Sequence, residues 1–114
     1  MTKAEQLEAL ALRCKQATGP DRKLDDAIAE MMHLGNRAYA PKYTASLDAA
    51  LTLVPEGMRP SVGQNVHHGY WHAFVQSIVD STPHQLGVAD SNTSGALALC
   101  AAALRARAQM ERGR

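Results

Sequence analysis

The chain has little of what membrane-spanning and secreted proteins require. Its longest nearly apolar run, residues 96–104, is far shorter than the roughly 18 residues of a membrane span. The N-terminal residues mix Glu and Lys into an apolar pattern, unlike a signal peptide. Two cysteines are a poor disulfide framework, so we interpret Cys14 and Cys100 as small buried hydrophobic residues rather than as a disulfide or a shared metal site. We expect a soluble, cytoplasmic protein that makes no membrane contact.

Neither sign of charge dominates. Twelve Lys and Arg residues against eleven Asp and Glu residues leave a net charge of +1, which disfavours nucleic acid and anionic membranes as partners. The one local excess is at the C-terminus, with Arg105, Arg107, Arg112 and Arg114 against a single Glu111. Such cations commonly offset the dipole of a helix C-terminus. A phosphate-binding tail is the alternative.

Catalytic motifs are absent as well. The sequence has no glycine-rich phosphate loop, no Ser or Cys nucleophile motif, no Cys-x-x-Cys pair and no internal repeat. Its acidic residues have simpler explanations, since Asp48 suits a first helical turn, and Asp25 and Asp26 are neighbours that cannot face each other. We therefore predict a protein that is not an enzyme and carries no cofactor.

Apolar residues recur at helical spacing in three segments of the first half of the chain. A helix over residues 3–17 is followed by a second that starts at Pro20, a residue suited to a first turn. A third, short helix begins after Thr44 or Ser46, either of which can cap it, and stops before Pro55. The expected inner faces are Leu7, Leu10, Ala11 and Cys14, then Leu24, Ile28, Met31 and Met32, then Leu47, Ala50, Leu51 and Val54.

The period changes beyond Gly57. The stretches "MRPSVG" and "GYWHAFVQSI", separated by "QNVHH", predict an antiparallel β-hairpin with Pro60 on an edge strand, because proline cannot donate to a ladder. An aromatic-bearing strand face that no helix covers is a natural contact surface. The alternative is that helices cover both faces. Alternation puts Trp71, Ala73 and Val75 on one face and Tyr70, His72, Phe74 and Gln76 on the other.

The histidines near the hairpin raise the question of a metal site. On a strand, His68 and His72 are about 13 Å apart, too far to share one zinc ion. His67 and His68 point to opposite faces if the strand extends to them. We interpret them as surface or turn residues and predict no metal. A metal-dependent activity of His67, His68, His72 and His84 is the alternative.

The remaining third of the chain holds a loop and a helix. Residues 79–95 carry Pro, Gly, Asp, Ser and Asn without a sustained period and predict a long surface loop. Asn92 or Thr93 is expected to cap a last helix over residues 94–110. We predict one α+β domain, residues 1–114, with four helices packed around a small antiparallel hairpin or sheet in the order α-α-α-β-β-α. The last helix buries Leu97, Cys100, Ala101, Leu104 and Ala108.

Three blocks carry a family resemblance: "LALRCKQATGPDRKLDDAIA" (10–29), "YTASLDAALTLVPEG" (43–57) and "ALALCAAALRARA" (96–108). They resemble small phage and prophage proteins of the phage ABA sandwich domain. The resemblance implies helices packed around a small sheet, an origin in phages of GC-rich bacteria and no catalytic role. Met58 stands where such relatives often have Trp, and the histidine cluster departs from their pattern, so no site residue is carried over.

The leading functional hypothesis is a non-enzymatic phage protein that binds a host or phage protein, for example to inhibit a bacterial defence system as anti-CRISPR proteins do. A virion or assembly component that self-associates is the alternative from a different class. Nucleic-acid binding by the arginine tail and metal-dependent activity rank below both. The predicted partner-binding residues are Tyr70, His72, Phe74 and Gln76, with Arg105 and Arg107 as a second patch.

Overall fold

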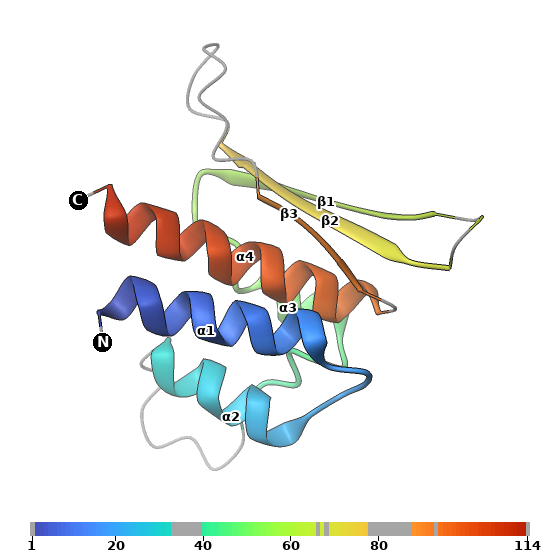
Figure 1. Ribbon diagram of the computed structural model, residues 1–114, viewed down its shortest axis with the longest axis horizontal. Helices are drawn as coiled ribbons and strands as arrows, with labels where there is room; N and C mark the ends of the chain where they lie inside the picture. Colours follow the sequence, from blue (N-terminus) through green and yellow to red (C-terminus); the bar gives the residue numbers. More distant parts are fainter. Residues whose placement is uncertain are drawn as a thin grey trace.

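The computed structural model describes residues 2–32, 40–65, 67, 69–77, 88–92 and 94–113. It confirms the α+β fold class: three helices precede an antiparallel hairpin, and a fourth helix follows the sheet (Figure 1). The elements are α1 Lys3–Gln16, α2 Arg22–Met31, α3 Leu47–Leu51, β1 Met58–Gln64, β2 Trp71–Ser77, β3 Val88–Asn92 and α4 Gly95–Arg112.

Polar side chains cap the helices where the sequence changes from turn residues to apolar periodicity. In each case the side-chain oxygen accepts a hydrogen bond from the backbone N–H three residues further on, which satisfies a donor that has no partner within the helix. Of the two caps proposed for the third helix, Ser46 is the one used. The four N-caps are Thr2, Asp21, Ser46 and Ser94.

The sheet has one strand more than the sequence predicted. Its order is β1-β2-β3, all antiparallel, so β2 is the central strand. The prediction of one continuous loop over residues 79–95 is wrong at Val88–Asn92, which pairs with Trp71–Val75 of β2. "VADSN" is poor in strand-forming residues, and its backbone becomes a strand because β2 offers an unpaired edge. Residues 78–87 lie outside the described part of the chain.

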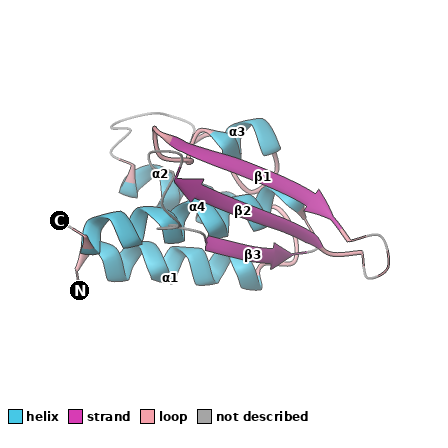
Figure 2. Cartoon of the chain, turned by 90° about the horizontal axis from the view of Figure 1, so that it is seen from above, coloured by secondary structure: helices cyan, strands magenta, loops and turns pink. Residues whose placement is uncertain are grey.

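The elements stack in layers with α4 in the middle. The sheet covers one side of α4, and α1 packs along the opposite side, running antiparallel to it so that both termini lie at the same end (Figure 1). Helix α2 packs against the outer side of α1, and α3 packs against α4. Seen from above, the three strands lie over these helices and nothing described covers their other side (Figure 2).

Helix α4 is buried on every side rather than on one stripe. All residues from Ala96 to Leu104 are buried, including those that the sequence did not assign to an inner face. Most are alanines, whose small side chains let α1 and the sheet approach the helix axis closely. The sheet is so near that a Cβ at Gly95 would lie 3.1 Å from the Trp71 ring. A side chain at this glycine would therefore displace the indole.

Helix α3 departs from its predicted inner face. Leu47 and Leu51 are exposed, whereas Ala50 and the following Leu53 are fully buried. The helix has only five residues, too few for a continuous apolar stripe, and of these only Ala50 is fully buried. The prediction that Leu47 and Leu51 are buried is therefore wrong.

Asn92 joins two distant segments. The prediction that Asn92 or Thr93 caps the last helix is wrong, because the cap is Ser94. The Asn92 Nδ2 donates to the carbonyl oxygens of Cys14, Lys15 and Ala17 at 2.9–3.1 Å, and its Oδ1 accepts from the Ser94 N–H. The side chain is 5% exposed. It thus bonds carbonyls at the C-terminal end of α1, where helical partners run out, and fixes β3 against that end.

Overpacking of α4 should be costly. We expect Ala101→Leu to lower the free energy of unfolding by about 1–3 kcal/mol, because this residue is fully buried and a larger side chain must displace its neighbours. The measurement is urea unfolding followed by circular dichroism. Ala9→Leu, the same exchange at an exposed position of α1, serves as the control and should change stability by less than about 0.5 kcal/mol. Equal stability of the two variants would show that α4 is not tightly enclosed.

Candidate functional site

Strand β2 alternates in burial, although on its outer side only His72 is exposed and Phe74 and Gln76 are half-buried. Ala73 and Val75 are buried against the α4 side of the sheet, and His72, between Trp71 and Ala73, is exposed. Tyr70, one residue before the strand, is 50% exposed. Its carbonyl accepts from the Asn65 N–H at 2.8 Å, so the hairpin backbone is held at the point where this ring projects.

The neighbouring strand completes a surface on the side away from the helices. In the register of the hairpin, Arg59 lies opposite Gln76, Ser61 opposite Phe74 and Gly63 opposite His72. Residues directly opposite each other share a face of the sheet. Figure 2 shows the described helices on the other side. We call this surface the outer face and define it by Arg59, Ser61, Gly63, Tyr70, His72, Phe74 and Gln76.

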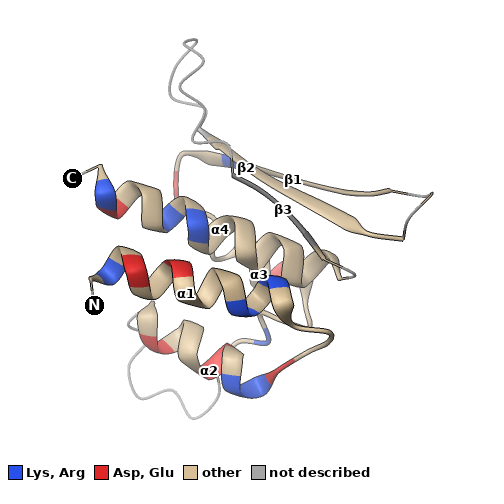
Figure 3. Cartoon of the chain, viewed as in Figure 1, with Lys and Arg blue, Asp and Glu red and all other residues tan. Residues whose placement is uncertain are grey.

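The outer face carries little charge. Strands β1 and β2 contain one formally charged residue, Arg59, while the acidic and basic side chains are concentrated on the helices (Figure 3). Its aromatic and amide side chains stand on a strand whose alternate residues, Ala73 and Val75, are fixed in the core. Such a surface loses little side-chain entropy and little ion hydration when a partner covers it.

Pro60 lies on an edge strand, as predicted, because β1 pairs with β2 alone among the described strands. The proline has no N–H and interrupts any ladder that an added strand could form along this edge. Addition of a partner strand at β1 is therefore disfavoured. The face of the sheet, rather than this edge, is the accessible contact surface.

The predicted arginine patch is divided between two sides of α4. Arg105 lies 3.7 Å from Glu8 of α1 in an ion pair, whereas the Nε of Arg107 donates to the Leu53 carbonyl at 2.6 Å, just beyond α3. Arg112 also pairs with Glu8, at 3.0 Å. Residues two apart on a helix point in nearly opposite directions, so the two predicted arginines do not act as one surface.

The histidine cluster is only partly within the described chain. His67 lies exposed in the hairpin turn and His72 is exposed on β2, while His68 and His84 lie outside the described residues. Within the described residues, no three His, Cys, Asp or Glu side chains come close enough together to hold a metal ion.

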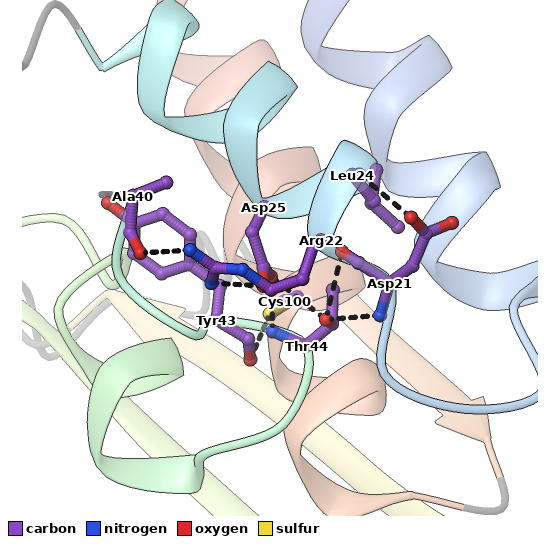
Figure 4. Close-up of polar contacts among 8 residues, drawn as sticks. All are labelled: Asp21, Arg22, Leu24, Asp25, Ala40, Tyr43, Thr44 and Cys100. Carbon is purple, nitrogen blue, oxygen red and sulfur yellow. Dashed lines mark hydrogen bonds and ion pairs between the residues drawn. The ribbon is translucent and has the colours of Figure 1, made fainter. Parts of the chain in front are cut away.

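A buried polar cluster was missed by the sequence reasoning (Figure 4). The Asp25 carboxylate is fully buried on α2 and accepts hydrogen bonds from both the N–H and the hydroxyl of Thr44, each at 2.8 Å. Arg22 forms an ion pair with its other oxygen at 2.8 Å and also donates to the Ala40 carbonyl. The Thr44 hydroxyl in turn accepts from the Asp21 N–H at 2.8 Å.

The arrangement of this cluster suits a structural role rather than a catalytic one. Each oxygen of Asp25 is occupied by a protein donor, and the carboxylate has no exposed surface on which a substrate could be placed. Its bonds fasten the chain around Thr44 to the first turn of α2. The sequence predicts no role for Asp25 beyond a charge in the first helical turn, because no local pattern links it to a threonine 19 residues away.

The two cysteines meet in the core beside this cluster. Both are free and buried, as predicted, and the Cys100 thiol donates to the Tyr43 carbonyl at 3.2 Å. A hydrogen bond with the Cys14 side chain, burial and the nearby Asp25 charge together raise the pKa of Cys100 well above its ordinary value. The thiol is therefore held neutral and is a poor nucleophile.

Removal of one hydroxyl tests the buried cluster. Thr44→Val keeps the shape of the side chain but removes a donor to Asp25 and an acceptor for Asp21, and we expect a loss of about 1.5–3 kcal/mol in unfolding free energy. Thr52→Val removes an exposed hydroxyl that bonds only its own turn and should cost less than about 0.5 kcal/mol. Chemical denaturation of both variants measures the difference, and equal values would rule out a stabilising role for the cluster.

Thiol labelling tests the environment of the cysteines. At pH 8, the folded protein should react with a thiol reagent only at the rate at which it unfolds, because both thiols are buried and the pKa of Cys100 is raised. In denaturing urea, both thiols should react within seconds. Mass spectrometry of quenched samples counts the labelled cysteines, and fast labelling of either one without denaturant would contradict the described packing.

Comparisons with known proteins identified no relative of this chain. No protein-family model, no curated protein and no solved structure matches the chain. The resemblance to the phage ABA sandwich domain therefore stays a prediction. Among the described residues, no helix has the length and apolar character needed to cross a membrane.

Proposed function

We propose that the protein works without catalysis, by binding another protein through the outer face of its sheet. The observation that carries the proposal is the central strand β2, whose Ala73 and Val75 are buried in the core. Its other side carries the exposed His72 and the half-buried Phe74, with the exposed Tyr70 directly before the strand. Aromatic residues are enriched at the centres of protein interfaces and dominate their binding energy.

The charge of the outer face favours a protein rather than a nucleic acid as partner. Nucleic-acid binding depends on several cations aligned with phosphates, and Arg59 is the single formal cation of β1 and β2. Arg105 and Arg107 are engaged with Glu8 and the Leu53 carbonyl, on other parts of the molecule. The proposed interface therefore keeps Tyr70 and its neighbours and leaves out the arginine patch.

The proposed kind of partner rests on the resemblance to the phage ABA sandwich domain, not on the geometry of the outer face. A small phage protein without catalytic groups acts by occupying a surface of a larger one. We propose a cytoplasmic host protein as the partner, and a nuclease or guide complex of a bacterial defence system as one concrete case.

A pair of charge substitutions tests the outer face. Tyr70→Glu places a carboxylate in the proposed interface, and Leu12→Glu places one at an equally exposed apolar position on α1, where Leu12 is 49% exposed. Partners are captured from bacterial host lysate by the tagged wild-type protein, identified by mass spectrometry, purified and titrated by calorimetry. We expect Tyr70→Glu to weaken direct binding by about tenfold or more and Leu12→Glu to leave it unchanged.

Two outcomes would count against the proposal. Equal binding by both variants would place the interface elsewhere on the molecule. Recovery of the protein alone, or of phage particle proteins, would favour a self-associating assembly component instead.

A further inference from the structure

A pocket of about 150 Å³ lies between the start of α1 and the end of α4, and no residue of the outer face lines it. Helices α1 and α4 and the last turn of α2 enclose it. It lies at the end of the molecule at which both termini emerge (Figure 1). Its lining combines apolar side chains with charges: Leu7, Met31, Met32 and Met110, with Lys3, Arg107 and Glu111.

Arg107 is the unusual group in this lining. It is partly buried, and burial lowers the pKa of its guanidinium, which means that the cation is poorly solvated there. Its Nε donates to the Leu53 carbonyl, but among the described residues no carboxylate pairs with it and no acceptor takes its terminal nitrogens. A desolvated cation with spare donors is favourably placed for an anionic ligand.

The other two charges in the lining offset each other. Lys3 and Glu111 form an ion pair at 3.5 Å, so the pocket as a whole carries one uncompensated positive charge, that of Arg107. Charge complementarity therefore selects a ligand with a single negative charge. The same uncompensated charge argues against a soft metal cation such as Cu(I), for which methionine thioethers are suitable ligands.

The three methionines in this mixed polar and apolar lining define the rest of the ligand. Methionine sulfurs make favourable contacts with aromatic rings, and an engineered protein cavity of about 150 Å³ holds benzene. We propose that this pocket binds a small aromatic monocarboxylate of the size of benzoate, with its ring among the methionines and its carboxylate on Arg107.

Methionine methyl resonances report directly on the pocket. The chain has five methionines, of which Met31, Met32 and Met110 line the pocket while Met58 lies on β1. Benzoate is titrated into protein labelled with ¹³C at the methionine methyl groups. We expect the three pocket methyls to shift along one saturable curve and Met58 to stay in place. Shifts that do not saturate, or that include Met58 equally, would overturn the proposal.

Charge on the ligand and on the protein is then varied separately. Benzamide, which has the same ring but no charge, should bind wild-type protein about tenfold or more weakly than benzoate. Arg107→Gln should weaken benzoate to a similar extent. Arg105→Gln, the same exchange two residues away in the ion pair with Glu8, should not change its affinity.

Folding of each variant is checked by its methyl spectrum without ligand. If Arg107→Gln unfolds because the bond to Leu53 is lost, the benzamide comparison decides, since it uses the wild-type protein. Equal affinity for benzoate and benzamide would refute the role of the carboxylate. The outer face of the sheet plays no part in these measurements, so their outcome is independent of the proposed protein interface.

Discussion

Burial of α4 on all sides is the constraint on which the rest of the structure depends. A helix in a small domain normally buries one stripe and exposes the other, but α4 has the sheet on one side and α1 on the other. The alanines of α4 make this arrangement feasible, because larger side chains would separate the layers. Helix α2 packs on α1, and the sheet packs on α4, so all the described helices lie on one side of the strands. No described helix covers the outer face.

Polar contacts fix the segments that surround this apolar centre. Asp25 with Thr44 fastens the chain before α3 to α2, and Asn92 fastens β3 to the end of α1. Each of these three side chains is buried. A buried polar group is costly unless all its hydrogen-bonding capacity is used, so such contacts tolerate only one arrangement of the segments. They give the small domain a unique packing that alanine and leucine alone would specify poorly.

The two proposed binding regions follow from the same layering. The outer face exists because no described helix remains to cover the strands, and the methionine-lined pocket exists where α1, α4 and the end of α2 meet near the termini. One is an exposed and nearly uncharged surface suited to a protein. The other is a small concave space with one uncompensated cation, suited to a small anion. They share no residue, which allows each to be tested without disturbing the other.

Local patterns in the sequence located α1, α2 and α4, the hairpin, the two faces of β2 and the edge position of Pro60. The predicted start of α2 at Pro20 is two residues early, because Asp21 is the extended N-cap and the helix begins at Arg22. Periodicity, caps and proline act over a few residues, so they can be read without knowledge of the fold. Tertiary structure alone decided that Val88–Asn92 forms a strand, that α4 is enclosed on every side, and that Asn92 bonds carbonyls as far as 78 residues away. The reason is physical: a sequence shows which residues are apolar or polar, but the partners that complete a backbone ladder or a buried hydrogen bond are brought together only by packing.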